Sequence, residues 1–295
     1  MVDKGNDVYA IDNFSTGKMK NFAHATGSRH LNIIRADVRR PAESTVKRIK
    51  RVDCVCHLAA MTSVQESIRD PRSTTDVNVI GTLRVLEMAR RLGADRVILA
   101  SSAAVYGMTQ DLPAKEDTPV APISPYGVSK AACELYCSAF EHNHGIQVFS
   151  LRYFNVYGPR QTSSQYSGVI SIFAKKLLRG RSLRIFGDGS QTRDFVYVSD
   201  VVDGTIQALE GDGMTSRVFN IAGGAETSIL GLAETMKNVV GSHSDLTFSP
   251  SHLGDLHRSC ADIARARKEL NYHPKVPLKD GLTQTIQYFA DEGAK

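Results

Sequence analysis

The sequence lacks the long apolar run that a membrane-spanning helix needs. A helix must carry about 20 predominantly apolar residues to cross a bilayer, and no stretch of the 295 residues approaches that length. The charged N-terminus also lacks the apolar core of a signal peptide. We therefore expect no membrane partner and a cytoplasmic protein.

Basic residues are in excess, with a formal net charge of +5, but they do not gather into a stripe with interleaved aromatics. This pattern argues against a nucleic acid partner and suits a small anionic ligand instead.

The five cysteines are odd in number and fall within regular elements, which predicts reduced thiols and no metal site. Internal repeats and low-complexity segments are also missing.

Apolar strands alternate with helices along the first half of the chain. Strands are predicted at 8–12, 31–37, 53–60, 96–102 and 146–155, and helices at 73–92 and 126–144. Nearly continuous apolar strands separated by helices predict an α/β fold: a Rossmann-like, doubly wound parallel sheet covered on both faces. We expect residues 1–155 to form this domain. Residues 156–295 should form mainly a smaller C-terminal lobe, with some segments returning to the sheet.

Small or polar residues end each predicted strand. Asp12, Asp37, Ser102 and Asn155 lie at such tips, and Ala59 and Ala60 follow the strand that begins at residue 53. In open parallel sheets, ligands bind outside the carboxyl ends of the strands. These residues therefore predict a site at one edge of the sheet.

One element of a dinucleotide-binding fold is not found. A ribose-binding acid at a strand tip, the position of Asp12, normally follows a glycine-rich turn by about 20 residues. Counting back from Asp12 passes Met1, and the later GDGS and AGGAE lack the required spacing. We expect the first strand and its turn to lie upstream of Met1; a defective relative is the alternative.

Tyr126 and Lys130 are four residues apart on a helix that begins near Pro125. This spacing puts both side chains on one helical face. A lysine ammonium beside a tyrosine is expected to lower the pKa of the phenol and make it a general base, and Ser102 is placed to share the proton. The spacing alone is also typical of an exposed tyrosine beside a solvated lysine.

Five segments in order, SSAAVYG, YGVSK, RYFNVYGPR, FGDGSQTRDFVYVSD and LGDLHRSCAD, resemble the extended short-chain dehydrogenase/reductases. Within these, the chain is most similar to the nucleotide-sugar epimerases of the UDP-glucose 4-epimerase type. The resemblance implies an NAD-dependent isomerase and, from residue 156 onward, a nucleotide-sugar-binding lobe. Such an enzyme inverts C4 of a UDP-hexose, glucose or galactose or the N-acetylhexosamine pair, by transient oxidation to a 4-keto sugar.

The resemblance also implies roles for individual residues. Catalysis would fall to Ser102, Tyr126 and Lys130. The NAD site would be lined by Asp12, Asn13, Asp37, Val38, Leu58, Ala59, Ala60, Asn78, Tyr126, Lys130 and Phe154. The UDP-sugar would be held by Ser102, Asn155, Arg193, Asp255 and Ser259. An ion pair with Asp194 or another acid is the alternative for Arg193. For Ser259 the alternative is packing beside the diphosphate, with another residue setting the limit on substrate size.

Three other functions are alternatives at this point. A 4,6-dehydratase of this fold would carry Asp-Glu after the catalytic Ser, where this chain has Ala103 and Ala104. A decarboxylase needs a pocket for a sugar carboxylate, which the sequence does not identify. A binding protein without catalysis would fit the missing glycine-rich turn, although the intact Ser, Tyr and Lys oppose it. His252 replaces an Arg of most relatives, which weakens one expected diphosphate contact.

The Tyr126 helix carries a second apolar face. Val128, Ala132, Leu135 and Ala139 lie opposite its catalytic face. We expect this face to pair with a second copy in a homodimer, and cover by the C-terminal lobe is the alternative.

Overall fold

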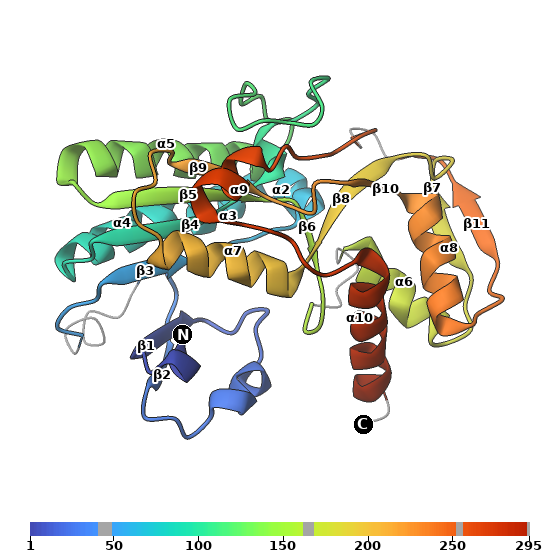
Figure 1. The fold of residues 1–295 in the computed structure, drawn as a ribbon, viewed down its shortest axis with the longest axis horizontal. Coiled ribbons are helices and arrows are strands. Elements are labelled where there is room, and N and C mark those ends of the chain that lie inside the picture. Colours follow the sequence, from blue (N-terminus) through green and yellow to red (C-terminus); the bar gives the residue numbers. More distant parts are fainter. Residues whose placement is uncertain (41–48, 162–167, 252–255, 294–295) are drawn as a thin grey trace.

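The computed structural model describes residues 1–40, 49–161, 168–251 and 256–293 (Figure 1). Its main sheet has four parallel strands in the order β3-β4-β5-β9. Their bounds are β3 Cys54–His57, β4 Arg96–Ser102, β5 Gln147–Tyr153 and β9 Val218–Ile221. The α/β, Rossmann-like class expected from the sequence is confirmed.

Helices cover both faces of this sheet because its strands are apolar on both sides. Val97 and Leu99 of β4 pack against α4 (Gly81–Arg91) and α5 (Pro125–His144), whereas Ile98 lies in the cluster on the opposite face. That second face is covered by α7 (Val198–Glu210), and α9 (Ala264–Leu270) packs on β9. Because successive side chains of β4 point to opposite faces of the sheet, this one strand contributes to two separate hydrophobic cores.

The helix predicted at 73–92 is continuous but not uniform. It consists of α3 (Pro71–Thr75), a π-helical turn η3 (Asp76–Ile80) and then α4. A short helix α2 (Val64–Arg69) precedes it, and the Asp70 side chain caps α3 by accepting from the Ser73 amide. Insertions of this π type frequently occur at functional sites.

The first two strands stand apart from the main sheet. β1 (Val8–Asp12) pairs in parallel with β2 (Leu31–Arg35), and 3-10 turns η1 (Val2–Lys4) and η2 (Met19–Ala25) complete this part (Figure 1). Within the described ranges no strand joins β1 to β3. The expectation that a further strand and a glycine-rich turn precede Met1 stays a prediction.

The remaining elements form a second cluster around its own apolar core (Figure 1). β8 (Thr192–Tyr197) lies between β10 (Glu226–Ser228) and β6 (Asn155–Tyr157), and β7 (Leu183–Phe186) pairs with β11 (Leu246–Ser249). Helices α6 (Val169–Leu177), α8 (Ile229–Val240) and α10 (Leu278–Gly293) pack there. The boundary at residue 155 stays a prediction. None of the helices in the described ranges has the length and apolarity to cross a membrane.

Candidate active site

The site is built where β4 ends and α5 begins. β4 ends at Ser102, and the chain turns through η4 (Ala103–Val105). The helix start is fixed by Ser124, whose hydroxyl accepts from the Gly127 amide at 3.1 Å, and by Pro125 in the first turn. Tyr126 and Lys130 are then 8% and 4% exposed, so the predicted surface alternative for this pair is wrong.

The three predicted catalytic side chains come together. Lys130 Nζ donates to the Ala100 carbonyl at 2.7 Å and lies 6.0 Å from the centre of the Tyr126 ring. The Ser102 hydroxyl is hydrogen-bonded with the Tyr126 phenol. Among the described residues Ala100 is the only hydrogen-bond acceptor of Lys130. Since an ammonium has three donors, the remaining N–H groups fit the hydroxyls of a bound ribose.

The expected lowering of the Tyr126 pKa is not present in the protein alone. Burial raises the pKa of the Tyr126 phenol, and the Ser102 hydrogen bond only partly opposes this. Burial likewise lowers the pKa of Lys130. Placing a phenolate and an ammonium in an apolar interior disfavours both charges, and in the protein alone this cost outweighs their mutual attraction.

Asn78 holds the loop that follows β3 against α5. Its Oδ1 accepts from the Met61 amide at 2.8 Å, and its Nδ2 donates to the Met61 carbonyl at 3.0 Å and to Ser129 Oγ at 2.9 Å. The predicted cofactor residues Leu58, Ala59 and Ala60 lie in the loop between β3 and Met61, and this clamp of Asn78 on Met61 fixes the end of that loop. The Asn78 side chain is buried and positions this loop through these bonds, and its predicted place in the NAD site stays a prediction.

The predicted adenosine side of the site lies at the tips of β1 and β2. Asp12 Oδ1 accepts from the Phe14 amide at 2.6 Å, and Asn13 Nδ2 donates to Asp37 Oδ2 at 3.1 Å. The Arg39 guanidinium also binds both Asp37 oxygens, each at 2.9 Å, and holds the pKa of that carboxyl far below its usual range. Arg39 was not anticipated, because no motif marks it.

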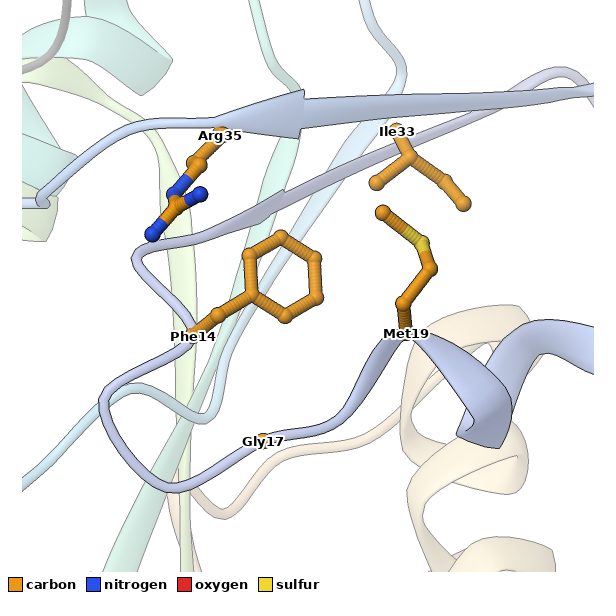
Figure 2. Close-up of a pocket in the computed structure, with 5 residues that line it drawn as sticks. All are labelled: Phe14, Gly17, Met19, Ile33 and Arg35. Atoms are coloured by element: carbon orange, nitrogen blue, oxygen red, sulfur yellow. The ribbon is translucent and has the colours of Figure 1, made fainter.

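A pocket opens beside the Asp12 loop (Figure 2). Its lining consists of Phe14, Gly17, Met19, Ile33 and Arg35. None of these residues was predicted, since the pocket arises from the pairing of β1 with β2 and not from a local motif. The nearby Val38 packs toward Gly81 at the start of α4, where a Cβ would lie 3.0 Å from Val38 Cγ2.

The predicted sugar-binding residues lie along β6, β8 and the segment before α9. Asn155 Nδ2 donates to the Asp194 carbonyl at 3.2 Å, and Arg193 Nη1 donates to the Leu256 carbonyl at 2.8 Å. Ser259 is buried. Asp255 and His252 lie outside the described residues. Phe154, expected to line the NAD site, is buried with its ring centre 6.3 Å from that of Tyr106.

Asp194 contacts backbone amides. Its Oδ1 accepts from Gly223 at 2.7 Å, and its Oδ2 accepts from Gly224 and from Ala261, each at 3.1 Å. Burial raises the pKa of Asp194 to about 6, and the three amides oppose this rise. The carboxyl thus fastens the segment containing Ser259 onto β8.

The family model for the NAD dependent epimerase/dehydratase family matches residues 1–222. The chain belongs to this family. The expected cofactor, NAD, is thereby confirmed. The chain is 38% identical over 289 residues to a UDP-glucose 4-epimerase of Mycolicibacterium smegmatis, an alignment that covers 98% of the chain and 92% of that relative.

Solved structures of this epimerase/dehydratase family superpose along the whole chain. A UDP-glucose 4-epimerase from Thermotoga maritima, solved with UDP-glucose, has a TM-score of 0.91 at 35% identity and covers 100% of this chain and 94% of its own. A UDP-glucuronic acid 4-epimerase from Bacillus cereus, solved with UDP-glucuronic acid and NAD, has a TM-score of 0.89 at 32% identity, covering 99% of this chain and 93% of its own.

Relatives with another named activity are also similar. A UDP-glucuronic acid decarboxylase 1 of Danio rerio is 36% identical over 293 residues, which cover 98% of this chain and 67% of that protein.

Proposed function

We propose that this protein is an NAD-dependent isomerase that inverts C4 of a UDP-hexose. The observation that carries the proposal is the convergence of Ser102, Tyr126 and Lys130, all from the junction of β4 and α5. Similarity to UDP-sugar 4-epimerases along the whole chain supports it. Bound NAD would supply the chemistry by accepting a hydride from the sugar and returning it to the other face.

The residues of the chain handle the proton. Tyr126, aligned by its bond with Ser102, takes the proton of the sugar 4-hydroxyl and later gives it back to the 4-keto sugar. Lys130 contributes positive charge, and its remaining N–H groups would hold the nicotinamide ribose of bound NAD. Burial raises the pKa of Tyr126; the positive charge of Lys130, together with that of bound oxidised NAD, would oppose this rise.

We propose that the UDP-sugar is held by Asn155, Arg193 and Asp255. The guanidinium of Arg193 can meet two phosphate oxygens at once. Ser259 is our candidate for the limit on the substituent at C2, because a small side chain leaves room for an acetamido group.

Decarboxylation of UDP-glucuronic acid is the second candidate function, because decarboxylases are also among the relatives. One assay separates the two. The purified protein is incubated with NAD and either UDP-glucose or UDP-glucuronic acid, and the products are resolved by chromatography and mass spectrometry. A C4 epimer of unchanged mass supports our proposal, whereas a UDP-pentose formed with release of carbon dioxide contradicts it.

We also propose a homodimer through the exposed face of α5. Leu135 is 73% exposed and Val128 53%, so the described part of the C-terminal lobe leaves this apolar face uncovered. The occupant we assign is the same face of a second copy. Light scattering should give a dimer for the parent and a monomer for Leu135→Asp. Val202→Asp, a similarly apolar position on α7, is the control and should remain dimeric; a monomeric parent contradicts the proposal.

A further inference from the structure

The face of α5 that carries the catalytic pair continues to a third residue. Tyr126, Lys130 and Glu134 follow one another at four-residue spacing, which places them on one side of the helix. The Glu134 side chain is 11% exposed and lies against β4 and β5. The proton transfer described above does not use it.

Both carboxylate oxygens of Glu134 are engaged. Oε1 accepts from Ser101 Oγ at 2.5 Å and from Arg152 Nε at 2.9 Å, and Oε2 accepts from Arg152 Nη2 at 2.7 Å. The Arg152 side chain is only 4% exposed. A forked ion pair at this depth fixes both distance and orientation, since moving either partner leaves a buried charge unpaired.

Three consecutive residues at the tip of β4 each hold one turn of α5. The Ala100 carbonyl accepts from Lys130, Ser101 donates to Glu134, and Ser102 is bonded with Tyr126. A shift of α5 along β4 therefore breaks all three contacts together.

Arg152 extends this anchor to the loop after Ser102. Its Nη1 donates to the Glu116 carbonyl at 3.0 Å, and its guanidinium lies 4.8 Å from the centre of the Tyr106 ring. The loop after Ser102 and the helix that carries Tyr126 thus both contact the Arg152 side chain of β5.

We propose that Glu134 is a positioning residue of the active site, which fixes the register of α5 against β4 through Ser101 and Arg152 and so aims Tyr126 and Lys130. This inference rests on the proposed function. The negative charge of Glu134 also favours the ammonium form of Lys130, because it raises the pKa of that group against the effect of burial.

The same helix offers a matched control. Glu141, seven residues further along α5, accepts at Oε1 from Arg217 Nε at 2.5 Å. This pair also ties α5 to the sheet side of the molecule, but it lies two turns beyond Glu134 and away from Tyr126. Glu141→Gln therefore measures the loss of an α5 ion pair as such.

The test compares steady-state epimerisation by the parent, Glu134→Gln and Glu141→Gln, each loaded with NAD. We expect kcat to fall about 30-fold in Glu134→Gln with KM within about twofold, because misalignment of reacting groups by a fraction of an ångström is costly. Glu141→Gln should keep kcat within about twofold. Equal kcat values in the two variants, at whatever melting temperatures, overturn the proposal.

Further measurements cover the other outcomes. Ser101→Ala removes only the hydrogen bond to Glu134 and should lower kcat about fivefold, whereas Ser101→Thr should restore kcat. If Glu134→Gln does not fold, these two variants test the positioning role, and an unchanged kcat in Ser101→Ala overturns it. Amide exchange of residues 126–134 should quicken in Glu134→Gln but not in Glu141→Gln. If the parent epimerises no UDP-hexose, the proposed function fails, and unchanged exchange in Glu134→Gln then overturns the positioning role separately.

Discussion

Gly127 and Ala104 approach so closely that a Cβ on Gly127 would lie 2.6 Å from the Ala104 carbonyl oxygen. Pro122 Cβ would be 2.9 Å away on another side. Gly127, the residue beside Tyr126, is therefore the point at which α5 rests on the loop after Ser102. Only a glycine permits this contact.

Gly127→Ala should lower both stability and turnover. Alanine gains about 1 kcal/mol of helix propensity over glycine, but overpacking against fixed backbone costs about 1–3 kcal/mol. We expect a lower melting temperature and a clear fall in kcat, since α5 must move away from Ser102. Ser138→Ala, at an exposed position of α5, is the control. A Gly127→Ala variant as stable and active as the parent would contradict this contact.

Tyr126→Phe should remove epimerisation while leaving UDP-sugar affinity nearly unchanged. The substitution deletes the proton-transferring hydroxyl, an effect of about 1,000-fold on kcat. Tyr136→Phe, on an exposed part of the same helix, is the control and should leave both turnover and UDP-sugar affinity unchanged. Epimerase assays and calorimetric titration with UDP measure the two quantities. Turnover of Tyr126→Phe within tenfold of the parent would exclude Tyr126 as the acid and base.

The sequence predicted elements that carry a strong local pattern. The strand predicted at 96–102 and the helix predicted at 126–144 are confirmed as β4 (Arg96–Ser102) and α5 (Pro125–His144), because an unbroken apolar strand and a Ser-Pro helix start are local signals. The grouping of Ser102, Tyr126 and Lys130 followed from their place in the strand order.

Other features depend on contacts between distant segments, which no local pattern encodes. The fork of Arg39 on Asp37 and the clamp of Asn78 on Met61 are of this kind. In the protein alone the pKa of Tyr126 is raised, not lowered, because burial, the dominant effect, depends on the folded surroundings. Glu134 was detectable in principle as the next residue in the spacing of Tyr126 and Lys130. Its buried partner Arg152 is 18 residues away in sequence.

The protein should bind NAD in preference to NADP by at least about tenfold. We expect Asp12 to accept from the adenosine ribose hydroxyls and to repel a 2′-phosphate. Calorimetric titration with each nucleotide measures the preference, and Asp12→Asn should narrow it. Asp3→Asn carries the same charge change in the same N-terminal part and should leave it intact. Tighter binding of NADP would refute the role of Asp12.

Stability should fall as the pH is lowered from about 6.5 toward 3. Burial lowers the pKa of His57 to about 3, with a smaller effect from the charge of Lys130, and its Nε2 lies 3.0 Å from Thr82 Oγ1. Between these pH values the unfolded chain binds a proton that the folded protein does not. The contribution of neutral His57 to the free energy of unfolding is therefore complete above pH 6.5, and at most about 5 kcal/mol of it is lost by pH 3.

Urea unfolding at several pH values tests this. His57→Gln cannot titrate in this range, so its free energy of unfolding should fall less steeply than that of the parent between pH 6.5 and 4. His273→Gln, at an exposed position, should follow the parent. Identical slopes for the parent and His57→Gln would show that His57 is not a buried neutral imidazole.

Ser259→Tyr should impair the N-acetylhexosamine pair more than the glucose and galactose pair. A tyrosine ring adds volume that a packed interior cannot absorb, and overlap is greatest with the larger substrate. The value of kcat/KM for each pair, in parent and variant, measures the selectivity. Ser259→Thr adds only a methyl group and serves as the control. Equal losses on both pairs would remove Ser259 as the determinant of size.

The π-turn at Asp76–Ile80 makes the site depend on the number of residues as well as on their kind. Each residue of an α-helix turns the chain by about 100°, so the deletion of one residue before Asn78 would rotate its carboxamide away from Met61 and Ser129. Every side chain of the clamp would survive, yet the loop after β3 would lose its hold on α5. Single-residue deletions in this turn should therefore be more harmful than most substitutions there.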